Sequence, residues 1–397
     1  MSGILQNKQG LKVLAIGCIA QFFMGIIYVW SVFVIPVSEV YEWEIRQVTL
    51  ITSFMLSFFS VGILASGKLQ SKISADKIVL LGGLLISAGM FTTAFIPAAF
   101  AWIMFISYGV IGGFGVGVVY NTITSAAQKW FPQNRGFATG LCVGIYGFST
   151  VVFAPLVVML VQQFGVRHTF IILAAIYLVV ILALFRFIRM PDEDNPTSAA
   201  SEAYLIKKQF TISETIRTRE FYFLTLAMML VTLTFLFLNP SLKIFAAERG
   251  LSESLGTALV MLSGVANATG RLTLPLLSDK VGRERTTIII IFVTTLVALL
   301  LSIAEGVFFM VAVVLAVFCF GGFPGLFQVL TSDYFGIKNV GANFGAVMVG
   351  FAISTLFFPM IIGMIGNRTT QFIILAILAS IGAILIRLLA MSKKKIK

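Results

Sequence analysis

Residues 128–147 read QKWFPQNRGFATGLCVGIYG, and residues 332–352 read SDYFGIKNVGANFGAVMVGFA, a related stretch displaced by about 204 positions with one inserted residue. Both stretches run from an aromatic residue and a phenylalanine, through a polar turn with a basic residue, into glycines and other small residues. In both, the polar turn separates two long apolar segments. The recurrence predicts a chain built from two related halves.

The composition places these halves in a membrane. Of 397 residues, 59% are hydrophobic and 11% charged, and the mean hydropathy is +1.02, which is far more apolar than a soluble domain. Stretches of roughly 20 apolar residues cross about 30 Å of hydrocarbon, and each is expected to be a helix because lipid offers the backbone no hydrogen-bond partner. Twelve such stretches lie near residues 11–37, 47–69, 77–97, 99–128, 136–163, 168–189, 221–245, 255–278, 286–304, 308–332, 341–365 and 369–391.

One long polar stretch, residues 190–220, divides the twelve spans six and six. We therefore expect an all-α membrane protein with twelve transmembrane helices in two six-helix halves, residues 1–189 and 221–397, joined by a linker. The mixed-charge end of the linker is expected to form a short surface helix. Twelve spans in two related halves are typical of a transporter whose site lies at the midplane between the halves.

The basic residues are distributed unevenly between the two sides of the predicted bundle. The N-terminus, the even-to-odd connections and the C-terminus carry 22 of the 28 lysines and arginines, whereas the opposite loops carry five. By the positive-inside rule, both termini are expected in the cytoplasm of a multi-pass protein of the cell inner or plasma membrane. The net charge of +12 thus reflects membrane topology, and no nucleic-acid partner is predicted.

The remaining cation is Arg271, which lies inside the eighth span, whereas all sixteen acidic residues lie in loops or at span ends. A charge inside a membrane is costly unless it is paired or hydrated. A guanidinium suits bidentate contact with a carboxylate, so the partner of Arg271 is predicted to be the substrate. The alternative is that Arg271 extends its side chain toward Asp279, about two helical turns away. Asn267 lies one turn before Arg271 on the same helix face and fits a polar cavity wall.

Polar and aromatic residues at the middle of other spans are candidates for the rest of the cavity wall, although packing is the alternative for each of them. Tyr120 is the strongest candidate, because it precedes Asn121 in a glycine-rich span. The full set of candidates from these spans is Tyr28, Tyr120, Asn121, Tyr146, Phe320 and Phe323.

The stretch LSDKVGRERT, residues 277–286, is a compact charged turn between the eighth and ninth spans. Gly282 permits the turn. Asp279 and Arg283 are able to bind neighbouring helix ends and to release them as the protein opens. These three residues are the predicted conformational gate. The alternative is that the basic residues of this loop only follow the positive-inside rule and have no role in gating.

With these features, the chain resembles the major facilitator superfamily and, within it, the oxalate/formate antiporter family, which is related to monocarboxylate transporters. The resemblance covers essentially the whole chain. It is carried by GIIYVWSVFVIPV (25–37), KWFPQNRG (129–136), GVANATGRLTLPLLSDKVGR (264–283) and FGGFPGLFQVLTSDYFGIKNVGANFG (320–345). The counterpart loop of the first half, SGKLQSKISADK (66–77), departs from the pattern, because Ser71 stands where aspartate is expected.

The resemblance implies that Arg271 binds a substrate carboxylate. The oxalate exchanger of the family has a second cation, a lysine in helix 11, and the aligned residue here is Phe351, which we place in the cavity wall. Proton-linked relatives commonly have aspartate where this chain has Asn267, so the resemblance leaves the coupling open between a proton and a counter-anion.

The sequence therefore predicts a secondary transporter of a small monocarboxylate of the pyruvate, lactate or formate type, working by alternating access. Alternatives are an oxalate or other dicarboxylate exchanger, and a membrane sensor that binds a carboxylic acid without moving it. No embedded acid, base or metal cluster indicates an enzyme, and no cofactor or metal is predicted. We expect a monomer.

Overall fold

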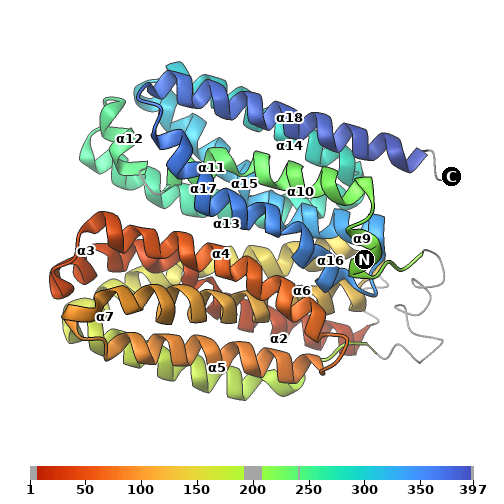
Figure 1. The fold of residues 1–397 in the computed structure, drawn as a ribbon, viewed down its shortest axis with the longest axis horizontal. Coiled ribbons are helices and arrows are strands. Elements are labelled where there is room, and N and C mark those ends of the chain that lie inside the picture. Colours follow the sequence, from red (N-terminus) through yellow and green to blue (C-terminus); the bar gives the residue numbers. More distant parts are fainter. Residues whose placement is uncertain (1–6, 192–207, 240–241, 395–397) are drawn as a thin grey trace.

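The computed structural model describes residues 7–191, 208–239 and 242–394, and this part of the chain is helical with no strand. Two bundles lie side by side, the N-terminal half in red to yellow-green and the C-terminal half in green to blue (Figure 1). The N-terminal half consists of α2 (Lys8–Met24), η1 (Gly25–Val29), α3 (Trp30–Tyr41), α4 (Ile45–Leu69), α5 (Ala75–Ala94), η2 (Ala98–Ile103), η3 (Phe105–Gly112), α6 (Gly113–Trp130), α7 (Arg135–Leu184) and η4 (Phe185–Phe187).

After the short helix α9 (Ile212–Thr215), the C-terminal half follows. It consists of α10 (Arg219–Val231), α11 (Leu233–Leu238), α12 (Leu242–Glu248), α13 (Glu253–Val281), α14 (Arg283–Ile303), α15 (Gly306–Phe335), α16 (Val340–Val347), α17 (Val349–Gly363) and α18 (Arg368–Lys394). Below, the end of the molecule that carries α9 and the end of α18 is called the linker end, and the end that carries α3 and α12 the distal end (Figure 1).

The expected helical membrane spans are confirmed. In the described residues, ten helical stretches are long and apolar enough to cross a membrane. One of them, Arg135–Phe187, turns at Gly165, whose φ of 75° suits glycine, and so provides two spans. α13, which has 29 residues and contains Arg271, is not among these ten and corresponds to the predicted eighth span. The predicted seventh span, near residues 221–245, corresponds to α10, α11 and the start of α12, and residues 240–241 within it lie outside the described residues.

The fourth span contains a π-helical stretch, η3, and the first, seventh and eleventh spans are interrupted part-way along. The first changes from α-helix to a tighter 3₁₀ turn over η1, the seventh is interrupted at Thr232, and the eleventh at Met348. Discontinuous helices at membrane depth are tolerated where they face a cavity or other protein. These interruptions lie on three helices that contribute side chains to the cavity described below.

Glycine faces hold the halves together. At Gly67 a Cβ would lie 2.3 Å from the backbone of Gly341, and at Gly136 it would lie 2.2 Å from the carbonyl of Pro275. Such overlaps exclude a side chain, so α4 approaches α16, and α7 approaches α13, backbone to backbone. This close packing holds the Arg271 helix against the N-terminal half.

Most of the predicted linker lies outside the described residues. Its C-terminal part contacts the linker end of the C-terminal half: the Phe210 N–H donates to Phe335 O over 2.9 Å, and Asn339 Nδ2 donates to Phe210 O over 2.9 Å. The predicted short surface helix is α9, and Thr211 and Glu214 cap it reciprocally.

Candidate carboxylate site between the halves

Arg271 lies in the interface between the two halves and is 1% exposed. Its Nε donates to Asn267 Oδ1 over 2.7 Å, and its Nη2 donates to the Tyr28 hydroxyl over 2.7 Å. The guanidinium carbon lies 5.1 Å from the centre of the Tyr28 ring and 5.5 Å from that of Tyr146, within the range of cation–π attraction. Neutral groups from both halves therefore hold the guanidinium.

No carboxylate in the described part of the chain forms an ion pair with Arg271. The alternative that Arg271 reaches Asp279 is contradicted, because Asp279 binds the start of α7 and Arg283 instead. Arginine has five N–H donors, and the bonds from Nε and Nη2 use two of them, so three remain, two of these on Nη1. The side chain is thus held in place with free donors on two adjacent nitrogens.

The position of Tyr28 depends on the 3₁₀ turn and on Gly25. At Gly25 a Cβ would lie 1.8 Å from Ser149 Oγ and 2.1 Å from Tyr146 O, so only a hydrogen fits where the first span crosses α7. The tighter turn over Gly25–Val29 then changes the direction of the following side chains relative to an α-helix. As a result, the Tyr28 hydroxyl reaches a residue 243 positions away in sequence.

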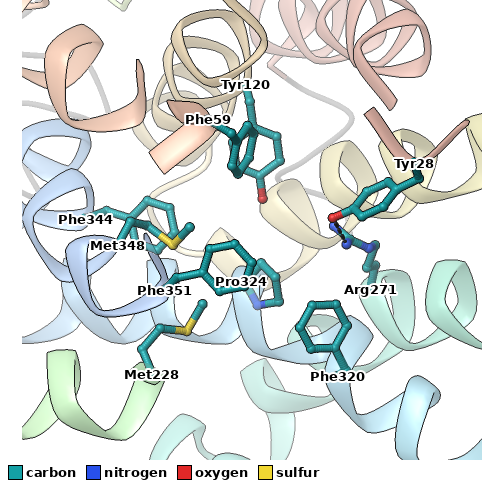
Figure 2. A pocket seen from close by; sticks show the side chains of 10 residues that line it. All are labelled: Tyr28, Phe59, Tyr120, Met228, Arg271, Phe320, Pro324, Phe344, Met348 and Phe351. Atoms are coloured by element: carbon teal, nitrogen blue, oxygen red, sulfur yellow. Dashed lines mark hydrogen bonds between the residues drawn. The ribbon is translucent and has the colours of Figure 1, made fainter. Parts of the chain in front are cut away.

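Arg271 and Tyr28 lie at the edge of a small buried cavity (Figure 2). The third polar residue in its wall is Tyr120, which is 1% exposed and whose hydroxyl has no hydrogen-bond partner. The other lining residues are apolar: Phe59, Met228, Phe320, Pro324, Phe344, Met348 and Phe351. The cavity volume is about 10 Å³, near the minimum that holds one water, so a bound organic anion requires some movement of these side chains.

A cluster of charges joins the halves at the linker end. Asp279 accepts hydrogen bonds from the backbone N–H groups of Gly136 and Phe137, over 3.1 and 2.9 Å, at the start of α7, where a helix favours negative charge. Arg283 bridges Asp279 and Asp333 over 2.9 and 2.5 Å. We call the four charged residues Arg135, Asp279, Arg283 and Asp333 the charge cluster.

Arg135, which begins α7, pairs with Asp333 over 2.7 Å. The cluster therefore connects one helix of the N-terminal half with three helix ends of the C-terminal half, α13, α14 and α15. Gly282, with φ of 99°, makes the turn between α13 and α14 that brings Arg283 back toward Asp279. The three predicted gate residues thus lie at one inter-half contact.

The sequence model of the protein family named Major Facilitator Superfamily matches residues 15–304 and 224–396 of this chain. The chain belongs to the Major Facilitator Superfamily. It is accordingly a multi-pass membrane protein and a secondary transporter rather than an enzyme.

Two curated proteins show the relationship of this Major Facilitator Superfamily chain at the sequence level. It is 29% identical over 345 residues to the uncharacterized MFS-type transporter YhjX of Escherichia coli (strain K12), covering 85% of this chain and 84% of that protein. It is 27% identical over 364 residues to the oxalate:formate antiporter of Oxalobacter formigenes, covering 90% and 84%. The resemblance to the oxalate/formate antiporter family is confirmed.

A solved structure shows the same fold. The transporter FucP in the outward conformation matches with a TM-score of 0.72 at 18% sequence identity, covering 96% of this chain and 99% of that one. At this identity the likeness concerns the fold alone.

Within this Major Facilitator Superfamily structure, most of the predicted site residues meet. Arg271, Tyr28, Tyr120, Phe320 and Phe351 line the cavity. Asn267 and Tyr146 do not line it but contact the Arg271 guanidinium.

Two predicted residues are not at the cavity. Asn121 Nδ2 donates to Ile63 O, Ser66 Oγ and Gly341 O over 2.8, 3.0 and 3.0 Å, so it ties α6 to α4 and α16. Phe323 is fully buried and packs against the edge of Phe327. The sequence did not separate these residues from their cavity-facing neighbours, because a polar or aromatic residue at midspan suits either role.

Five lining residues were not predicted: Phe59, Met228, Pro324, Phe344 and Met348. Apolar residues in an apolar helix carry no signal of their own. The one sequence signal among the five was Pro324, a proline inside the tenth span, where it removes a backbone donor.

We expect Gly147→Ala to weaken anion binding while leaving the fold intact. The new Cβ would lie 2.6 Å from Arg271 Cδ and 3.2 Å from its Nε, so the guanidinium must shift away from Asn267 and Tyr28. Disturbing hydrogen bonds of a charged group costs about 1.5–3 kcal/mol, so the dissociation constant of a bound carboxylate should rise roughly tenfold or more. Gly264→Ala on α13 is the matched control, because nothing lies within 4 Å of its Cβ position. Equal affinities of the two variants would show that the packing at Gly147 does not position Arg271.

Proposed function

We propose that the protein moves a small monocarboxylate across the cytoplasmic membrane by alternating access, with Arg271 as the carboxylate anchor. The observation that carries this proposal is the state of Arg271: a buried guanidinium, held by Asn267 and Tyr28, with donors free on Nη1 and Nη2 beside a cavity. Two adjacent guanidinium nitrogens match the two oxygens of a carboxylate. An anionic substrate also supplies the charge partner that the described residues lack.

Tyr120 supports the same proposal. Its hydroxyl points into the cavity from the wall of the N-terminal half (Figure 2), and it is buried without a partner. A buried hydroxyl without a partner is unfavourable by about 1–3 kcal/mol. Donation to a substrate oxygen removes this penalty, so Tyr120 acts as an orienting group, and substrate binding draws on both halves of the protein.

The number of cations favours one carboxylate over two. Arg271 is the one charged residue among those that line the cavity in the described structure. Phe351, at the position where the sequence comparison expects the second cation of an oxalate exchanger, lines the same cavity. A second carboxylate here would be desolvated without a partner, which disfavours oxalate and other dicarboxylates as substrates.

The linker end faces the cytoplasm in this proposal, because the positive-inside rule places the basic connections there. With the charge cluster closed, the carboxylate site is separated from the cytoplasm, and opening of the cluster gives access from that side. The roles of Asp279, Gly282 and Arg283 as a gate follow from this position. A proton or a counter-anion is the proposed coupled species, and the proposed working unit is the monomer.

The test is uptake into proteoliposomes that contain the purified protein. We expect saturable uptake of at least one of labelled pyruvate, lactate and formate, and no competition by oxalate at equal concentration. An inward proton gradient and an internal load of unlabelled acid distinguish proton coupling from anion exchange. Binding of the acid with no movement would favour a sensor, and oxalate uptake would overturn the single-carboxylate proposal.

A further inference from the structure

The cavity has two chemically different ends. The guanidinium of Arg271 and the Tyr28 hydroxyl face it from one side, Met228, Met348 and Phe351 face it from the other, and the Tyr120 hydroxyl lies between the two groups (Figure 2). Met228, Met348 and Phe351 come from α10 and from the interrupted eleventh span. They are 0%, 2% and 4% exposed, so they are part of the wall and do not face bulk lipid.

The apolar end offers no hydrogen bond of ordinary strength. Thioether sulfur is at most a weak acceptor, and phenylalanine has no donor or acceptor. A charged, hydroxyl or amide group placed there would lose its hydration without gaining a partner, at a cost of several kcal/mol. Hydrocarbon placed there gains about 0.8 kcal/mol for each methylene removed from water.

Methionine also gives this end its adaptability. Its unbranched side chain has three rotatable bonds and fills irregular gaps. Met348 lies between α16 and α17, and its backbone keeps helical hydrogen bonds to Phe344 and Ala352, so the adaptability at this position comes from its side chain. The cavity of about 10 Å³ is therefore able to expand toward the methionines. Phe320, by contrast, is held by stacking on Phe235, with 3.6 Å between the ring centres.

Resting on the proposed function, we infer that the substrate is an aliphatic monocarboxylate whose uncharged carbon chain lies against Met228, Met348 and Phe351, and that the two methionines select its length. The carboxylate binds Arg271 at one end of the cavity. The methyl end of the chain points to the other. Recognition of the substrate therefore depends on a tail as well as on a charge.

This inference predicts a graded dependence of affinity on chain length. From formate through acetate and propionate to butyrate, each added methylene should lower the dissociation constant about fourfold, which corresponds to 0.8 kcal/mol. The gain should reverse once the chain exceeds the space that the methionines can vacate. A terminal hydroxyl on the same chain should cancel the gain, because its desolvation is not compensated.

The experiment is isothermal titration calorimetry of the full-length protein in detergent, with the straight-chain acids from formate to octanoate and with 4-hydroxybutyrate. In Met348→Ala, three heavy atoms are removed, so the chain length of tightest binding should increase by at least two carbons. Met228→Ala should shift the profile in the same direction and carries the test if the first variant does not fold. Met261→Ala is the matched control, because Met261 is 69% exposed on α13 and does not line the cavity.

The outcomes separate the two proposals. Affinity that is highest for formate or flat along the series, or a profile that both methionine variants leave unchanged, would overturn the tail inference while the Arg271 anchor stands. Absence of binding of every acid by the wild type would instead overturn the proposed function, and the tail inference with it. A shifted optimum in a methionine variant, with an unchanged profile in Met261→Ala, supports both.

Discussion

Replacement of Arg271 by alanine is expected to abolish monocarboxylate uptake while the protein remains folded. The substitution removes the one charged side chain in the cavity wall that the structure describes and leaves Asn267 and Tyr28 without their shared partner. Truncation of one member of a buried, hydrogen-bonded charge pair costs about 2–5 kcal/mol. The dissociation constant for pyruvate or butyrate should therefore rise from roughly 30-fold to a few thousand-fold, and uptake should fall to the level of empty liposomes.

Arg271→Lys makes the prediction more specific. Lysine keeps the charge but has no planar pair of donors and cannot hold Asn267, Tyr28 and a carboxylate with the same geometry. We expect intermediate affinity, at least tenfold weaker than the wild type. Arg387→Ala is the matched control, because Arg387 is exposed on α18, and this variant should transport normally. Size-exclusion profiles and circular dichroism establish that each variant is folded, and full transport by folded Arg271→Ala would mean that the arginine only packs the two halves together.

The sequence predicted the fold in large part because each span must be long, apolar and helical. Those requirements act locally, so the twelve spans could be read from composition. The interrupted helices were not predicted, because the 3₁₀ turn at Gly25–Val29 and the interruption at Met348 contain no proline. Their geometry depends on contacts between distant segments, such as the fit of Gly25 against Ser149.

The positions of some candidate residues could be predicted where a residue was chemically out of place. A cation in an apolar span identified Arg271, and helical spacing then placed Asn267 beside it, which the structure confirms with a direct hydrogen bond. Tyr120 was the strongest of the other candidates and Asn121, the next residue, was also a candidate, but adjacent helix residues point in different directions. Only the packing of α6 shows that Tyr120 faces the cavity and that Asn121 binds α4 and α16.

The charge cluster carries the second prediction with a large expected effect. Asp333→Asn keeps the shape of the side chain but removes the charge that Arg135 and Arg283 share across the interface between the halves. The three side chains are 8–13% exposed, and breaking a buried ion pair costs about 3–5 kcal/mol. Because the remaining arginines also repel each other, the equilibrium should shift toward opening at the linker end by at least tenfold.

The measurement is the labelling rate of a cysteine at Gln328 by a membrane-impermeant maleimide added at the linker end. Gln328 is fully buried and donates to Thr124 Oγ1 of the other half over 2.7 Å, so a cysteine there is labelled only when the halves separate at that end. The three native cysteines are buried and are replaced by serine in the background protein. We expect at least tenfold faster labelling with Asp333→Asn.

The matched control is Glu214→Gln, which breaks the Lys208–Glu214 pair on the same end of the molecule. That pair spans 3.6 Å with side chains 67% and 45% exposed, and exposed pairs contribute about 0–1 kcal/mol, so its loss should leave labelling unchanged. Faster labelling with Asp333→Asn alone would show that the cluster holds the linker end closed. Equal labelling in all three proteins would contradict a gating role, and closure at this end would then depend on the glycine-mediated packing of α7 against α13 and of α4 against α16.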